Sequence, residues 1–336
     1  MVDESAAQDE QESDESGLGE VASAALGHVT GLPAPVQKTL GYVLKRLTTS
    51  FMEVPQAYFA GKVAEIQATS DARVRAIQAS GSAIADQIQV PPTYLDAAGI
   101  KFAERIVGKQ KNLDAIANKA VHELSRRSPP EMTGDSTASA EISDDWMNTF
   151  EAEAENMSSD EMRNVFAKLL AGEVARPGSF SRRAIKVLGQ MGNEEAELFA
   201  RYSSLAIQFT KAEKVFGGLL MTVGERPSTN GLGKYGLDYR SLLALVEYGL
   251  VLIDMDGAQQ VEFEKQGDDI SFLHSGKHYR CVYEGQAKTT VKLYGVVTSQ
   301  AGKELMQLVT PIPDPQYTER LERHLKALSL RLEEVK

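Results

Sequence analysis

The sequence predicts a mainly α-helical fold with a small α+β part, arranged as N-terminal long helices, a central helical bundle and a C-terminal winged-helix-like module. Two observations support this fold class. Apolar residues recur every three or four positions over most of the chain up to about residue 210, which is the helical period. Short runs of strand-forming residues appear only after Tyr239.

The chain begins with an acidic segment. Residues 1–37 hold eight acidic side chains and no Lys or Arg, whereas the whole chain has a net charge of −11. The remaining residues carry 39 acidic and 36 basic groups, a difference of −3, so charge does not indicate a general nucleic-acid binder. We expect residues 1–34 to be a disordered acidic tail.

Residues 35–127 are expected to form long helices. Apolar residues from Val36 to Leu47 share one face, and Pro55 ends or kinks that helix. A weaker stripe runs from Gln56 to Gln89 until Pro91-Pro92, with Ala and Ser at many of its positions. Such a stripe requires a partner helix, from this chain or from another copy. A further helix follows at about 95–126.

The segment 128–140 is rich in Pro, Gly, Ser and Thr, and we expect it to be the linker at the main domain boundary. The region 141–210 is predicted to be a helical bundle with short loops. Its helix starts are predicted at Ser143, at the Ser158/Glu161 capping box, at Ser179 or Ser181, and at Asn193. Pro177-Gly178 is expected to end the helix before it.

A loop-rich connection, residues 211–237, leads to a winged-helix-like α+β module at 238–312. The module is expected to contain a helix at 239–250, a hairpin with its turn at Ser275-Gly276, and a helix at 300–308. Its expected strands are Val251–Met255, Val261–Glu264, Ile270–Leu273, Tyr279–Tyr283 and Thr290–Tyr294. A C-terminal helix, 313–336, follows, with leucines at positions 321, 325, 328 and 332 that suit either a short coiled coil or a face docked on the domain.

The run LLAGEVARPGSFSRRAIKVLGQM, residues 169–191, and the following NEEAELFARYSSLA resemble a bacterial family of uncharacterised proteins, a domain-of-unknown-function family. Leu242–Val251 and Thr298–Leu305 fit the later motifs of that family, so the resemblance covers roughly residues 140–310. A looser similarity links the chain to abortive-infection alpha proteins, which implies a role in phage defence. The resemblance supplies no catalytic residues.

Five residues form a candidate site for an anion or a partner: Arg176, Ser179, Ser181, Arg182 and Arg183. Free backbone N–H groups at a helix start, the helix dipole and guanidinium groups all favour negative charge. Phosphate, a nucleotide or an acidic partner would fit. The alternative is that these arginines form ion pairs within the bundle, with Asp144, Asp145, Glu151 or Glu173.

Other motifs give weaker signals. Gly231, Gly233 and Gly236 match G-x-G-x-x-G, but a polar loop precedes them where a dinucleotide site needs a buried strand. His274 and His278 flank a hairpin turn without the carboxylates of a metal site. The chain has one cysteine, Cys281, which fits a reducing compartment. We therefore predict no catalytic residues, no metal and no cofactor.

The sequence thus favours a non-enzymatic interaction or regulatory protein of the bacterial cytoplasm, which self-associates through its N-terminal helices and binds a protein partner. Phage defence or stress is the expected process. One alternative is a DNA-binding regulator that uses the winged-helix-like module, although the helix at 239–250 has only Arg240 as a basic residue. Another is a nucleotide- or anion-binding protein. Membrane contact through residues 25–59 is not favoured, because they carry few basic residues.

Overall fold

The computed structural model describes residues 32–48, 92–127, 141–211, 214–224, 230–252, 254 and 257–335. The chain divides into two compact units at Gly178/Ser179. Most of the predicted acidic tail, the predicted helix at 56–89 and the predicted linker at 128–140 lie outside the described residues.

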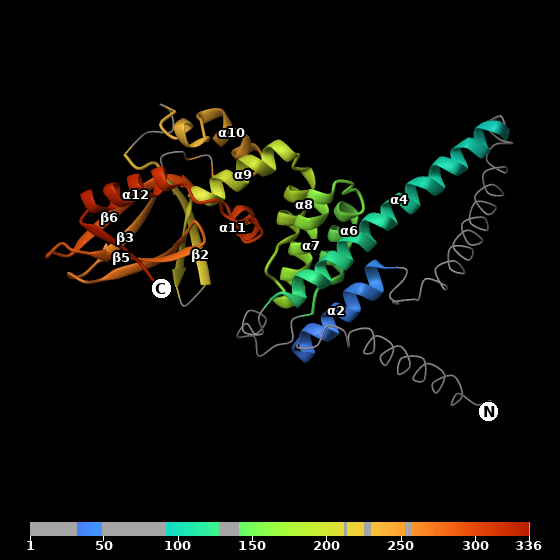
Figure 1. Ribbon diagram of the computed structural model, residues 1–336, viewed down its shortest axis with the longest axis horizontal. Helices are drawn as coiled ribbons and strands as arrows, with labels where there is room; N and C mark the ends of the chain where they lie inside the picture. Colours follow the sequence, from blue (N-terminus) through green and yellow to red (C-terminus); the bar gives the residue numbers. More distant parts are fainter. Residues whose placement is uncertain are drawn as a thin grey trace. The chain divides into compact units, whose positions relative to one another are not determined.

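The N-terminal unit is helical in its described part (Figure 1). Its helices are α2 (Ala34–Leu47), α4 (Pro92–Ser125), α6 (Asp144–Ala154) and α7 (Asp160–Ala175). Ser143 caps α6 as predicted, because its side chain accepts a hydrogen bond from the backbone N–H of Trp146. The cap of α7 is Ser159, one residue later than predicted. Helix α7 ends before Pro177, and Gly178 has φ of 86°, as the sequence predicts for this stop.

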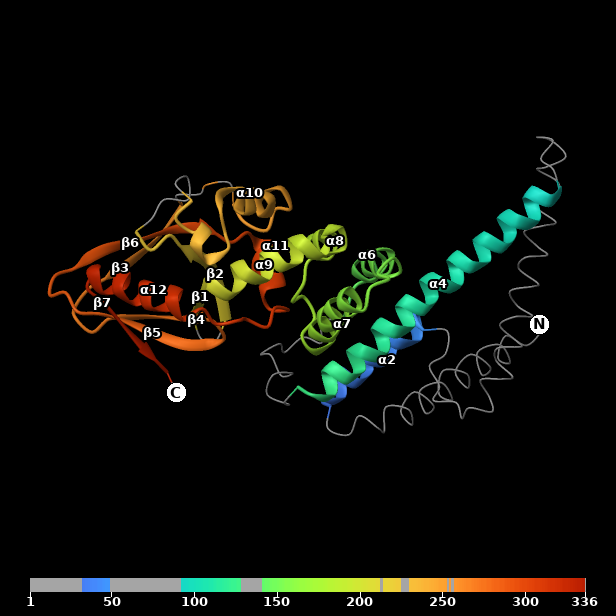
Figure 2. The ribbon, with the colours of Figure 1, turned by 45° about the horizontal axis from the view of Figure 1, so that its top comes forward.

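One apolar stripe of α4 forms the centre of this unit, where α2, α6 and α7 pack on it. Its buried residues are Leu113, Ile116, Ala117, Ala120 and Leu124. The rings of Trp146 and Phe150 stack at 5.2 Å and continue to Phe166 on α7. Both views show α4 continuing well past the helices that cover this half (Figures 1 and 2).

The C-terminal unit starts with α8 (Arg182–Gln190) and α9 (Asn193–Leu205). It also contains a 3-10 helix η2 (Gly233–Tyr235) and the helices α10 (Tyr239–Glu247), α11 (Gln300–Met306) and α12 (Pro315–Ala327). Its strands are β1 (Ile207–Lys211), β2 (Lys214–Met221), β3 (Gly257–Phe263), β4 (Asp269–His274), β5 (Lys277–Tyr283), β6 (Thr289–Val297) and β7 (Leu330–Glu334).

These strands form one antiparallel sheet with the order β3-β6-β2-β1-β4-β5-β7. The sheet curls into a half-barrel, and α12 lies within the curl in both views (Figures 1 and 2). The curl brings β3 and β5, which are far apart in this order, close together: the rings of Phe263 on β3 and Tyr283 on β5 stack with their centroids 5.0 Å apart. Tyr317 on α12 anchors the helix through its hydroxyl, which donates to the carbonyl of Met221 on β2 at 2.8 Å.

The predicted fold class, mainly α with a winged-helix-like module, is therefore wrong for the C-terminal unit. The strands β1 and β2, in a region expected to be the end of a bundle and a loop, are central strands of the sheet. The hairpin β4–β5 forms as predicted around Ser275-Gly276, both of which have positive φ. It pairs with β1 along its length and is thus part of a large sheet rather than the wing of a small helical module.

The predicted C-terminal helix is also too long. Helix α12 ends at Ala327, Ser329 has φ of 60°, and Leu332 lies on β7 opposite Cys281. Leu321 and Leu325 are fully buried within this unit, so that face of α12 docks on its own domain. Among the described residues, no helix combines the length and the apolar character needed to cross a bilayer.

Candidate functional site

The five residues of the predicted anion site fall on both sides of the unit boundary. Arg176 is the C-cap of α7 and belongs to the N-terminal unit. Ser179, Ser181, Arg182 and Arg183 belong to the C-terminal unit, where Ser181 is the N-cap of α8. The side chain of Ser181 accepts from the backbone N–H of Ala184 at 3.2 Å, so Ser181 is the cap of the two that the sequence offers, Ser179 and Ser181.

A carboxylate of the same unit already lies at the start of α8. The backbone N–H of Ser181 donates to Oε2 of Glu304 at 2.7 Å, and Gln300 donates to the other carboxylate oxygen at 2.9 Å. Glu304 is only 8% exposed. Its negative charge therefore occupies the position beside the helix N-terminus that a bound anion would take. The anion site stays a prediction, in which a ligand would compete with Glu304.

Three of the carboxylates that the sequence offered as partners of the arginines also have contacts elsewhere in the N-terminal unit. Arg46 on α2 forms ion pairs with Asp144 at 2.7 Å and with Glu151 at 2.5 Å. Glu173 accepts from the backbone N–H of Gly178 at 2.6 Å. In the C-terminal unit, the Arg183 guanidinium lies so close to Gly249 that a Cβ there would be 2.7 Å from Nη2.

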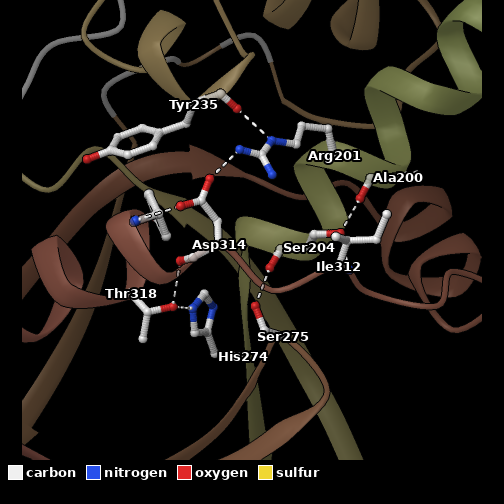
Figure 3. A network of polar contacts seen from close by, with 10 residues as sticks. Ala200, Arg201, Ser204, Tyr235, His274, Ser275, Ile312, Asp314 and Thr318 are labelled. Carbon is white, nitrogen blue, oxygen red and sulfur yellow. Dashed lines mark hydrogen bonds and ion pairs between the residues drawn. The ribbon is translucent and has the colours of Figure 1, made fainter.

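A second polar cluster lies where α9, α12 and the hairpin β4–β5 meet (Figure 3). Arg201 on α9 forms an ion pair with Asp314 and donates from Nε to the carbonyl of Tyr235 at 2.6 Å. Asp314 is the N-cap of α12 and accepts from the backbone N–H of Tyr317 at 3.0 Å. Burial alone would raise the pKa of Asp314, but this N–H and the Arg201 guanidinium outweigh it, so the pKa is lowered.

His274 lies at the buried end of this cluster and is 1% exposed. The hydroxyl of Thr318 donates to the carbonyl of Asp314 at 3.0 Å, so it accepts from Nε2 of His274, also at 3.0 Å. The Nδ1 atom is buried without a hydrogen-bond partner. Desolvation lowers the pKa of His274, although the carbonyls of Ala206 and Leu205 and the charge of Asp314 oppose this shift. The imidazole is therefore neutral near pH 7.

Two serines connect the same cluster to the backbone. Ser275 donates to the carbonyl of Ser204 at 2.8 Å, and Ser204 donates to the carbonyl of Ala200 at 2.7 Å. The backbone N–H of Ile312 donates to the Ser204 hydroxyl at 3.0 Å (Figure 3). These contacts hold the segment that leads into α12 against the end of α9.

Serine, histidine and aspartate thus lie near one another, but not in a catalytic arrangement. In a nucleophilic triad the aspartate orients the histidine and the histidine accepts the serine proton. Here the Asp314 carboxylate pairs with Arg201, His274 contacts Thr318, and Ser275 donates to a backbone carbonyl. The cluster holds three elements together and presents no activated nucleophile.

The remaining sequence motifs do not form a ligand site in the described part of the chain. Gly233 and Gly236 of the glycine motif lie at the start and the end of η2, and Gly236 has φ of 82°. His278 pairs with Leu273 across the hairpin, so it lies on the face opposite to buried His274. No group of three or more His, Cys, Asp or Glu side chains that could hold a metal ion occurs among the described residues.

The comparisons with known proteins give one match. A family model described as "Protein of unknown function (DUF2806)" matches residues 101–322, which is about two thirds of the chain. The predicted resemblance to a domain-of-unknown-function family is thereby confirmed. No curated protein matches, and no solved structure matches.

Proposed function

Because the chain belongs to the DUF2806 family, whose function is unknown, we propose its function from its own residues: a non-enzymatic interaction protein that self-associates through the outer half of α4, residues 98–110. We propose that the protein works in the bacterial cytoplasm. Its proposed role there is regulation, in phage defence or stress. These finer assignments rest on the sequence resemblance and on the single cysteine.

The apolar surface on the outer half of α4 is the observation that carries this proposal. Its exposed side chains are Ile100 at 59%, Phe102 at 48%, Ile106 at 42% and Val107 at 39%. Scattered apolar residues on a surface need no explanation, but these four form two ridges within about two turns of one helix, Phe102 with Ile106 and Ile100 with Val107. Such a concentration of exposed apolar side chains is typical of an interaction site. Burying the exposed half of each would contribute about 1 kcal/mol per side chain.

The spacing within this patch suits a second copy of the chain. Ile100 and Val107 are seven residues apart, so they form one ridge along the helix, with small Ala103 between them. In an antiparallel pair of α4 helices, Ile100 would lie beside Val107 of the partner subunit, and the same contact would recur at the other end. A two-fold symmetric interface requires this reciprocity.

The polar clusters support the non-enzymatic part of the proposal. Glu304 is bonded to the start of α8, and Asp314 is bonded to Arg201 and to the start of α12. Both carboxylates stabilise the fold through these contacts. The DNA-binding alternative depended on a winged-helix-like module, and the hairpin assigned to it belongs to the seven-stranded sheet.

Mass in solution tests the proposal. Light scattering of the full chain over a range of concentrations should show an oligomer, and Ile100→Glu with Val107→Glu should shift the mass towards the monomer. Phe216→Glu is a matched control that should leave the mass unchanged. Phe216 on β2 is also an exposed apolar side chain, at 54%, but it belongs to the C-terminal unit and not to α4. A monomer at every concentration would refute self-association.

The nucleotide- or anion-binding alternative has its own test. Thermal shift with phosphate and nucleotides should show no stabilisation of the wild type if Glu304 fills the start of α8. Stabilisation that disappears in Arg182→Glu with Arg183→Glu would favour the anion site instead.

A further inference from the structure

Arg320 on α12 has a donor that the protein itself leaves unpaired. Its Nε atom is buried without a hydrogen-bond partner, and Nδ1 of His274 is the other such side-chain atom among the described residues. A buried unpaired group in a native fold needs an explanation, and an ion that binds there is one. Arg201 on α9 shows the contrast, because it pairs with Asp314 and donates to the carbonyl of Tyr235 (Figure 3).

The Arg320 guanidinium lies beside the turn that follows β2. A Cβ on Gly224 would be 3.9 Å from Nη2 of Arg320 and 3.5 Å from Nδ1 of His324, so both nitrogens lie next to this glycine. Gly224 has φ of 85°, a conformation that other residues rarely adopt. Arg320 and His324 are four residues apart on α12, which places them on one face of the helix. Two basic side chains therefore meet at one turn of the backbone.

This pair carries one positive charge near pH 7. A guanidinium keeps its proton at any ordinary pH. Burial, and after it the charge of Arg320, lowers the pKa of His324, so its imidazole is neutral. Among the described residues, no carboxylate lies within ion-pair distance of Arg320, and Glu319 on the same helix pairs with Arg323 at 3.6 Å instead. The uncompensated charge is that of a site for a monoanion.

We propose that Arg320 binds the carboxylate of an organic acid, with His324 beside it and Gly224 as the wall of the site. The side of a guanidinium that carries Nε–H and Nη2–H donates two parallel hydrogen bonds to the two oxygens of a carboxylate. In Arg320 these are the unpaired Nε and the Nη2 next to Gly224. Because Nε is covered, the guanidinium turns outward as the acid binds.

The charge of the site favours a carboxylate over a phosphate. A phosphate monoester carries about −1.5 to −2 at pH 7, which one guanidinium and a neutral imidazole neutralise only in part. The site also differs from the predicted anion site at the start of α8, since none of its residues belongs to that helix. It does not depend on self-association, because no residue of α4 takes part.

Thermal unfolding of the full chain with sodium benzoate or sodium acetate tests the proposal, against sodium chloride at equal ionic strength. Benzoate at ten times its dissociation constant should raise the melting temperature of the wild type by about 3–6 °C. Benzamide, which has the same ring without the charge, should not. Arg320→Gln should abolish the shift, and Arg320→Lys should also lose it, because an ammonium group has no fork.

Arg323→Gln is the matched control. Arg323 is an exposed arginine on the same helix, so this variant should respond to benzoate as the wild type does. Each shift is measured against the same variant without benzoate, so a change in basal stability does not affect the result.

The remaining outcomes decide against the proposal. No shift of the wild type with either acid overturns it, and so does a shift that persists in Arg320→Gln or is full in Arg320→Lys. Sodium phosphate that stabilises as well as benzoate overturns the choice of a carboxylate. Glu225 follows Gly224 in the sequence. A response to benzoate in Glu225→Gln but not in the wild type would assign Arg320 to the chain's own carboxylate and not to a ligand.

Discussion

Substitution of buried His274 should change how the stability of the C-terminal unit depends on pH. His274 is 1% exposed, its Nδ1 atom has no hydrogen-bond partner, and the rings of Tyr279 and Tyr317 lie 6.1 and 5.9 Å from its own. The only charged group identified as favouring its cation is Asp314, whose carboxylate is already paired with Arg201. The folded protein therefore resists protonation of this imidazole, and its pKa is lowered.

The direction of the effect follows from proton binding. An unfolded chain has an ordinary imidazole that binds a proton near pH 6.5, whereas folded His274 does so only at lower pH. The free energy of unfolding is therefore independent of this group well above pH 6.5 and falls as the pH drops below it. The loss approaches about 1.4 kcal/mol per pH unit for one proton, until the folded group also titrates. His324, whose pKa burial also lowers, adds a loss of the same sign.

The test is urea unfolding of the full chain, followed by far-UV circular dichroism between pH 7.5 and 5.5. His274→Gln keeps an N–H near the position of Nε2 for Thr318 but cannot titrate, so its stability should fall less steeply with decreasing pH than that of the wild type. His278→Gln is the control, because His278 is exposed on the neighbouring strand. If His274→Gln keeps the full wild-type pH dependence, the assignment of that dependence to His274 is refuted.

Three further predictions concern buried polar groups of the C-terminal unit. Tyr202→Phe should lower the free energy of unfolding by about 1–2 kcal/mol, because the fully buried hydroxyl donates to the carbonyl of Val296 at 2.9 Å. Tyr239→Phe, at an exposed position, should leave that free energy unchanged in the same urea titration. Glu304→Ala should cost about 1–3 kcal/mol, since the Ser181 N–H loses its acceptor, and phosphate should recover part of that loss in a thermal-shift assay. Cys281 should resist a thiol reagent at pH 8 and react once urea unfolds the chain, because burial raises its pKa to about 12; rapid labelling of the folded protein would contradict this.

The helical elements could be predicted because their signals are local. Ser143, Ser181 and the Pro177-Gly178 stop act within one turn of the helix that each begins or ends, so the sequence pattern and the structure agree on them. Helix α4 was likewise predicted from its apolar period, to within a few residues at each end.

The sheet could not be predicted in full because its pairing is not local. The strand β2 lies in the segment expected to be a loop-rich connection, residues 211–237, and its Gly218 is a site of close packing: a Cβ there would lie 2.5 Å from Oγ1 of Thr298. The strand β7 continues a leucine spacing that also suits a helix, and only its pairing with β5 decides its conformation. Local patterns do not record which strand lies beside which.

The candidate site shows the same limit. Ser181 was identified as a helix cap from its neighbours, but its second partner, Glu304, is 123 residues away in sequence. Arg201 and Asp314, which are separated by 113 residues, were not predicted to meet. The pair Asp314-Pro315 is a sequence signal for the start of a helix, and it could have marked one end of that ion pair.

The strand order has a consequence for synthesis on the ribosome. Among the strands that the structure describes, β3 pairs only with β6, whereas β4 and β5 can add to β1 as soon as they emerge. During translation, residues 257–263 must therefore wait, with their backbone groups unpaired, until residues 289–297 have been made. A nascent chain that stalls between these two segments would expose an open strand edge along β2, which is the kind of edge that chaperones cover and that promotes aggregation.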